Sequence, residues 1–120
     1  MVDEGLEALN EAFTIIAKSA EGFHKADLYR LKGELLLLRH GDSETTQAYT
    51  CFQRAIEIAQ NQRAKSWELR STMSLARLLT KQNRRDEARA MLAEIYNWFT
   101  EGFDTADLKD AKALLDQLAT

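Results

Sequence analysis

The sequence contains no proline, and glycine and cysteine are scarce, with five residues and one residue among 120. Turns between β-strands need proline and glycine most, so their scarcity disfavours a fold of strands and tight turns. Cys51 is the only cysteine and has no partner for an internal disulfide bond. Helices tolerate this composition well, and these absences together predict an all-α protein.

Long apolar runs and a strong charge of one sign are also missing. The longest apolar run, Leu35 to Leu38, is far shorter than the roughly 20 residues that span a bilayer. The acidic, amphipathic N-terminal stretch does not resemble a signal peptide. The net charge is −3, whereas a nucleic-acid surface normally needs a basic excess. We therefore expect a cytoplasmic protein with no membrane and no nucleic-acid partner.

Apolar residues recur at helical spacing in six segments. The predicted helices span residues 3–20, 23–39, 43–60, 64–81, 84–100 and 105–119. Three glycines are placed to end helices in a left-handed conformation: Gly22, Gly41 and Gly102. Three polar residues precede helices and are expected to cap their first amides: Ser43, Asn83 and Asp104. Short connections of this kind make neighbouring helices antiparallel.

The chain also resembles itself. At an offset of 40 residues, three alanines coincide: Ala8, Ala48 and Ala88. At an offset of 80, the segment EGFHKADL reappears as EGFDTADL, with six of eight residues identical. One helical hairpin cannot hide its apolar stripe, so successive hairpins of similar sequence are expected to stack. The alternative is a bundle of similar helices without a repeat.

A small residue recurs six positions after an acidic one in three helices: Gly33, Ser74 and Ala113. Antiparallel helices approach most closely where one side chain is short, and the partner helix then inserts a larger one. Gly33 is therefore expected to face Phe52 on the following helix, between Ala48 and Ala55.

This order of small and large residues resembles the tetratricopeptide repeat. The matching residues are Gly33, Ala48, Phe52 and Ala55, then more loosely Ser74, Ala88, Leu92 and Ile95. The period is near 40 residues rather than the usual number of about 34, and the usual proline is missing. The resemblance implies an all-α fold in which antiparallel helix hairpins stack as a right-handed superhelix of about six helices. Residues 1–22 are then a half repeat, 23–62 and 63–102 are repeats, and 103–120 is a capping helix.

A wider likeness covers nearly the whole chain. It rests on the stretches LYRLKGELLL, CFQRAIEIAQ, AKSWELRSTMSLARLL and WFTEGFDTADLKDAKALLDQL. They resemble the C-terminal region of bacterial signalling proteins that join a class III adenylate or guanylate cyclase to an AAA-type ATPase. The resemblance implies a sensor or scaffold segment of a larger protein. The chain has no Gly-rich phosphate loop followed by lysine and no cyclase metal aspartates, so it is not expected to be an enzyme.

No catalytic, cofactor or metal site is recognisable in the sequence. His24 and His40 lack a second histidine or cysteine at ligand spacing. Cys51 lies beside an apolar stripe, which predicts a partly buried, inert thiol. One compact cluster is basic: Lys81, Arg84, Arg85 and Arg89. Asp86 and Glu87 interrupt it, so a helix start of mixed charge is favoured over a phosphate-binding site.

The aromatic residues divide into two groups. Phe99 continues the stripe of Leu92 and Ile95 and is expected to be buried. Trp67 and Trp98 lie off the stripes, and each is a candidate for an exposed anchor or for contact with a neighbouring repeat.

By analogy with the tetratricopeptide family, the first helix of each hairpin lines a concave surface. The expected partner-binding residues are Asp27, Arg30, Glu34, Leu37, Glu68, Ser71, Leu75 and Leu78. An acidic edge over an apolar floor suits an amphipathic helix or an extended peptide with basic residues. We expect a protein-interaction or scaffold module that binds a partner protein or another domain of its parent chain, without a cofactor. The alternative is a small-ligand sensor that biases an upstream cyclase or ATPase.

Stacked hairpins leave apolar faces uncovered at the ends of the stack. We therefore expect the chain to form a dimer through its terminal helices. Light scattering at increasing concentration should show a rising mass, whereas a strict monomer at high concentration contradicts this expectation.

Overall fold

The computed structural model describes residues 25–40, 45–102 and 105–119, together with Gly5, Glu7 and Glu11. This part of the chain forms five helices: α2 (Lys25–His40), α3 (Thr45–Asn61), α4 (Lys65–Lys81), α5 (Arg85–Tyr96) and α6 (Ala106–Ala119). It contains no strand, which confirms the expected all-α class. Gly5, Glu7 and Glu11 are helical, as the first predicted segment requires. Several positions singled out in the sequence lie outside the described residues: Ala8, Gly22, His24, Gly41, Ser43 and Asp104.

The helices α3, α4 and α6 closely match their predicted ranges, but α5 ends at Tyr96 rather than near residue 100. The backbone amides of Trp98 and Phe99 bond the carbonyls three residues before them, at 3.2 and 3.1 Å. The chain therefore tightens into a turn. Phe99 still packs half-buried against the core. The apolar pattern in the sequence therefore extends past the end of the helix, which is why the predicted helix was too long.

Helices α3 and α4 end in the same backbone motif. Arg63 and Asn83 are left-handed, with φ of 55° and 62°. The next amides, of Ala64 and Arg84, each bond a carbonyl five residues back at 2.8 Å. This is the Schellman arrangement, which satisfies carbonyls that the helix end leaves open. The prediction that Asn83 caps α5 was wrong, because Arg84 occupies that position without a side-chain cap.

Gly102 is left-handed as expected, with φ of 79°. It lies in the loop before α6 rather than at the end of α5. Its carbonyl accepts a 2.9 Å bond from the Thr105 amide. The Thr105 hydroxyl in turn lies 3.5 Å from the Leu108 amide, at the start of α6. The loop thus places the Thr105 hydroxyl near a free amide in the first turn of α6.

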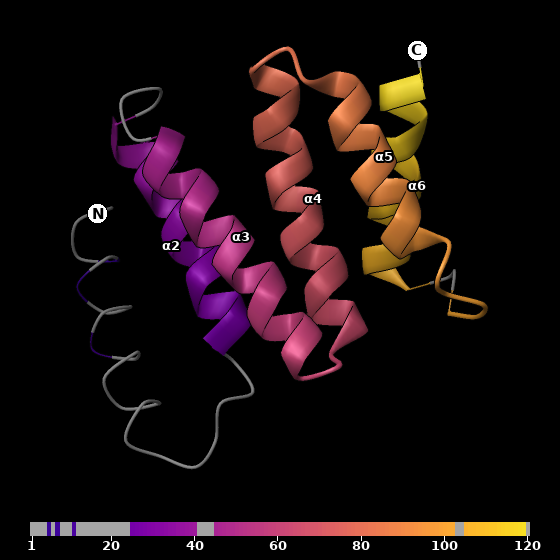
Figure 1. The fold of residues 1–120 in the computed structure, drawn as a ribbon, viewed down its shortest axis with the longest axis horizontal. Helices are drawn as coiled ribbons and strands as arrows, with labels where there is room; N and C mark the ends of the chain where they lie inside the picture. Colours follow the sequence, from indigo (N-terminus) through magenta and orange to yellow (C-terminus); the bar gives the residue numbers. More distant parts are fainter. Residues whose placement is uncertain are drawn as a thin grey trace.

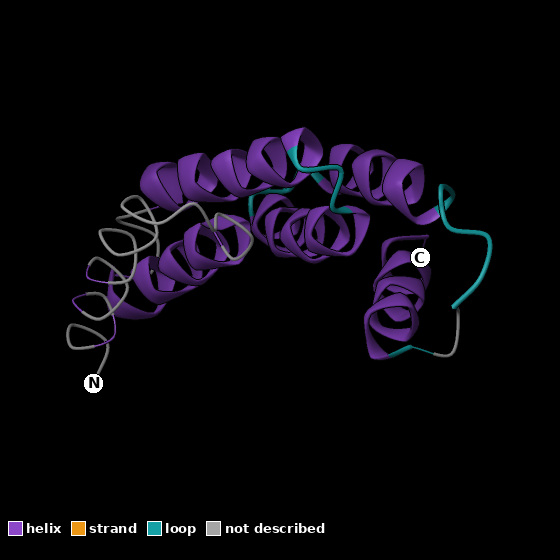
Figure 2. Cartoon of the chain, turned by 90° about the horizontal axis from the view of Figure 1, so that it is seen from below, coloured by secondary structure: helices purple, strands orange, loops and turns teal. Residues whose placement is uncertain are grey.

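The helices pack around α4. Successive helices run antiparallel (Figure 1), and α4 contacts α2, α3, α5 and α6. In the described part of the chain, the backbones of α3 and α5 do not come close to one another, and neither do those of α2 and α6. Viewed from below, the helices form two layers along a common arc (Figure 2). Helix α4 is therefore the interior element of the protein.

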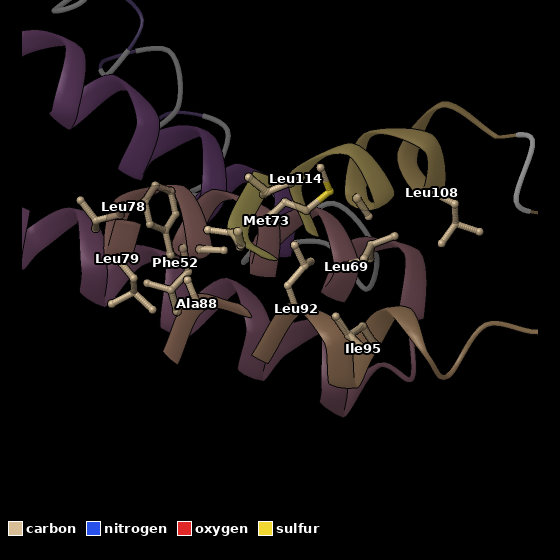
Figure 3. Close-up of a cluster of buried hydrophobic side chains, with 14 of the residues drawn as sticks. Phe52, Leu69, Met73, Leu78, Leu79, Ala88, Leu92, Ile95, Leu108 and Leu114 are labelled. Carbon is tan, nitrogen blue, oxygen red and sulfur yellow. The ribbon is translucent and has the colours of Figure 1, made fainter. Parts of the chain in front are cut away.

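One apolar core runs from α3 to α6 through α4 (Figure 3). Its largest fully buried hydrophobic side chains are Phe52, Leu69, Leu75, Leu79 and Leu92. Burying a leucine or phenylalanine contributes about 1.5–3 kcal/mol relative to leaving it exposed. Helix α4 contributes most of these residues, and ten of its side chains are buried.

The close approach of α2 and α3 depends on Gly33. A Cβ atom added there would lie 2.6 Å from Cε1 and 2.9 Å from Cδ1 of Phe52. The Phe52 ring is fully buried, so it has no open space to enter. The predicted small-against-large contact is therefore present. Ser74 is also buried, whereas Ala113 is exposed on α6.

We predict that Gly33→Ala destabilises the protein. Overpacking costs about 1–3 kcal/mol, and the better helix propensity of alanine offsets about 1 kcal/mol, so a net loss of up to about 2 kcal/mol is expected in urea unfolding. Adding Phe52→Leu should recover part of this loss, because it removes the atoms that clash.

The matched control is Ala113→Gly, which makes the reverse exchange at an exposed position of α6. It measures helix propensity alone and should cost about 1 kcal/mol. A Gly33→Ala protein about 1 kcal/mol more stable than the parent, the gain from helix propensity alone, would show that the two helices do not meet at this point.

Candidate functional site

A groove lies between α2 and α6, with α4 as its floor. We call it the α2–α4–α6 groove; it encloses about 320 Å³. Its lining residues are Glu34, Leu37, Ser74, Arg77, Leu78, Thr80, Lys81, Arg85, Leu114, Gln117 and Leu118. Four of them follow helical spacing on α4: Ser74, Arg77, Leu78 and Lys81. They face the same way because residues three, four and seven apart share one face of a helix.

The floor of this groove carries a polar atom with no partner. Ser74 is only 2% exposed, and its hydroxyl makes no hydrogen bond within the described residues. A buried hydroxyl without a partner is unfavourable and needs a physical explanation. Since Ser74 lines the groove, a ligand there can supply the missing bond.

The rim of the α2–α4–α6 groove is basic. Arg77, Lys81 and Arg85 face a single carboxylate, Glu34. Among the described residues no carboxylate pairs with Arg77 or Lys81, while Arg85 donates to the Gln117 carbonyl at 3.3 Å. The sequence predicted an acidic edge for the binding surface, whereas three cations from α4 and α5 border the apolar floor of this groove. Such a surface attracts an anionic ligand.

The structure separates the eight expected binding residues. Glu34, Leu37 and Leu78 line the α2–α4–α6 groove. Ser71 and Leu75 are only 1% and 2% exposed and do not line the α2–α4–α6 groove. Their side chains are covered because α4 has neighbours in both layers.

Asp27 and Arg30 belong to an ion-pair network that links three helices. The Arg30 Nε donates to the Asp27 carboxylate at 2.8 Å. Arg70 of α4 reaches Asp27 at 3.8 Å on α2 and Asp107 at 3.0 Å on α6. Asp27 and Asp107 occupy equivalent places in the repeated segment. This network fixes helix positions, so these charges are already engaged within the chain.

A second groove lies between α3 and α5, over another face of α4. We call it the α3–α5 groove; it consists of two hollows of about 240 and 340 Å³. The hollows share Ile56, Gln60 and Met91. The remaining lining residues are Gln53, Glu57, Lys65, Glu68, Thr72, Leu75, Glu94, Ile95 and Trp98. Glu68, one of the eight expected residues, belongs here.

The two tryptophans differ in environment. Trp67 is half-buried against Ala26 and Ile58 of the preceding hairpin. The Arg70 guanidinium lies 5.1 Å from its ring centre. Trp98 is 56% exposed at the α3–α5 groove. Trp67 thus makes contact with a neighbouring hairpin, and Trp98 is the exposed candidate anchor.

The start of α5 is a region of mixed charge, as expected. Arg84 forms two 2.8 Å hydrogen bonds with the Glu87 carboxylate. Its guanidinium also lies 5.7 Å from the Tyr49 ring centre. The Glu87 hydrogen bond is the main factor that raises the pKa of Arg84, so this side chain stays charged.

Cys51 is buried beside Leu36, with 9% of its surface exposed. Burial raises the pKa of the thiol above its ordinary value, and the nearby positive charge of Lys32 opposes this effect. The thiolate is the reactive form of cysteine, so this environment lowers reactivity near neutral pH.

Metal-binding and membrane-spanning features were sought in the described residues. These residues contain no group of three or more His, Cys, Asp or Glu side chains placed to hold a metal ion. Within the same residues, none of the helices has the length and apolar character needed to cross a membrane.

No protein-family model, curated protein or solved structure matches this chain. Its function is therefore inferred from the residues and their geometry.

We predict that Cys51 reacts slowly with iodoacetamide in the folded protein. Since burial raises the pKa of the thiol, the midpoint of the rate–pH profile should lie above that of the urea-unfolded chain. Lys32→Ala should move the midpoint further upward, because the lysine charge favours the thiolate. A midpoint below that of the unfolded chain contradicts the burial described above.

Proposed function

We propose that this chain is a protein-interaction module that binds a segment of a partner protein in the α2–α4–α6 groove. The observation that carries the proposal is the floor of the groove, where the buried Ser74 hydroxyl has no partner among the described residues. Leu37, Leu78 and Leu114 supply apolar contacts around it. Groove binding of this kind combines apolar anchors with a few placed polar groups.

The charge of the rim supports one class of segment. Arg77, Lys81 and Arg85 outnumber the one carboxylate, Glu34. A peptide with acidic residues on one face and apolar residues on another complements this arrangement. Its carboxylates pair with the rim, while a backbone or side-chain group bonds Ser74.

The finer architecture is part of this proposal. We infer that the hairpins α2–α3 and α4–α5 are tetratricopeptide-like repeats stacked as a right-handed superhelix, with α6 as the cap. The repeated segment, the Gly33–Phe52 contact and the two curved layers support it. In such a stack the first helices of the hairpins share one side, which is where the groove lies.

The sequence resemblance suggests a setting for the module. Its likeness to the C-terminal region of bacterial cyclase–ATPase signalling proteins supports a scaffold role in a larger cytoplasmic regulator. A partner is then another protein or another domain of the parent chain.

A small-ligand sensor is the second candidate. A volume of about 320 Å³ lies at the lower end of the range for small-molecule pockets, and the basic rim suits a compact anion. A thermal-shift series with phosphate and dicarboxylates separates the candidates. A rise in melting temperature at micromolar concentration supports the sensor, and its absence favours the peptide module.

We predict that an amphipathic peptide of glutamate and leucine binds the parent chain. Arg77→Glu combined with Lys81→Glu should raise its Kd by about tenfold or more, since it replaces attraction with repulsion. Ser74→Ala should weaken binding by a smaller factor without lowering stability, because it removes an unpartnered buried hydroxyl. Fluorescence anisotropy of the labelled peptide measures both effects.

The matched control is Lys109→Glu combined with Lys112→Glu, which also reverses two charges, at exposed positions of α6 outside either groove. It should leave Kd within about twofold of the parent value. Equal losses in the control and in the groove variants would show general charge attraction and contradict a groove site.

A further inference from the structure

We propose that the α3–α5 groove is a second, independent interaction site that binds a basic amphipathic helix of a protein partner. It lies over a different face of α4 from the α2–α4–α6 groove. Its lining is mainly acidic, whereas the rim of the α2–α4–α6 groove is basic, so the two sites favour segments of opposite charge.

The shape of the groove follows from the packing. Helices α3 and α5 both contact α4, and their backbones do not come close to each other in the described chain. They form two walls over a floor that includes Thr72 and Leu75 of α4. Ile56 and Met91 line both hollows, which joins them into one apolar channel between the walls. A channel bounded by helices accepts the apolar face of another helix.

Three carboxylates and one lysine set the charge of the groove. Glu57 and Glu94 are exposed on opposite walls, and Glu68 lies on the floor, 8% exposed. Lys65 pairs with Glu68, and Arg54 lies 3.8 Å from Glu57 beside the groove, so Glu94 is the lining carboxylate that pairs with no described cation. The excess negative charge complements a helix whose polar face carries lysine or arginine.

The groove already binds one ammonium group, which belongs to the chain itself. The Lys65 ammonium lies 3.3 Å from a Glu68 oxygen and 5.3 Å from the Trp98 ring centre. A Gln60 amide donates to the other Glu68 oxygen at 3.3 Å. The buried carboxylate and the ring therefore surround a cation of the chain itself, an arrangement that is favourable for positive charge. Glu94 lines the same hollow, so a partner cation can enter beside Lys65.

Trp98 provides the apolar anchor at this end of the groove. Its side chain is 56% exposed, although its ring is held edge-on against Phe99 at 5.2 Å and 88°. An exposed but positioned tryptophan loses little conformational entropy on binding, and tryptophan is enriched at the centres of protein interfaces. Trp98 thus presents a fixed surface beside the carboxylates.

The test uses a labelled amphipathic peptide of lysine and leucine with the full chain. Trp98→Ala and Glu94→Lys should each raise its Kd by about tenfold. The matched control, Asp110→Lys, makes the same charge reversal on exposed α6 outside either groove and should change Kd by less than about twofold. Melting curves establish that each variant is folded.

A second readout reports the location of binding. In a Trp67→Phe chain, Trp98 is the only indole, and its emission should shift when the lysine peptide saturates the protein. The Arg77→Glu and Lys81→Glu variant of the α2–α4–α6 groove should still bind the lysine peptide. Unchanged Trp98 emission, equal losses in Asp110→Lys, or loss of binding in the α2–α4–α6 groove variant would each overturn the proposal. No binding of the peptide at all would overturn it as well.

Discussion

Helix α4 packs against helices of both layers, and the rest of the structure depends on how those helices cover its apolar side chains. Its side chains Leu69, Leu75 and Leu79 are almost fully removed from water. No single hairpin can cover them, so α2 and α3 must close one side and α5 and α6 the other. The stability of the protein therefore depends on contacts between hairpins as well as on those within them, as expected for stacked helical units.

The same packing generates both grooves. Because α4 contacts all four neighbours while the backbones of α2 and α6, and likewise those of α3 and α5, do not come close to each other, a channel remains above two faces of α4. One channel is lined by the buried Ser74 and by cations, and the other by the buried Glu68 and by further carboxylates. The opposite charge of the two channels underlies the proposal that they bind different segments.

The sequence predicted the helices well because their apolar spacing is regular, and it predicted the Gly33–Phe52 contact because a glycine inside a helical stripe needs a packing reason. The surface expected from family analogy is divided in the structure. Ser71 is buried and lines neither groove, whereas Leu75 lies on the floor of the α3–α5 groove. Arg77 and Lys81 line the α2–α4–α6 groove and were not singled out from the sequence, although their spacing with Ser74 indicates a shared face.

Helix ends were ambiguous for a different reason. Asparagine favours both a cap before a helix and a left-handed residue after one, so Asn83 could not be assigned from its type alone. Only the backbone bonds at the end of α4 decide between them.

Native-state hydrogen exchange tests the central role of α4 most directly. If α4 is the interior element, its amides should exchange last, through global unfolding, while those of α2 and α6 exchange earlier through local opening. Exchange of α4 as fast as that of α2 or α6 would contradict the account.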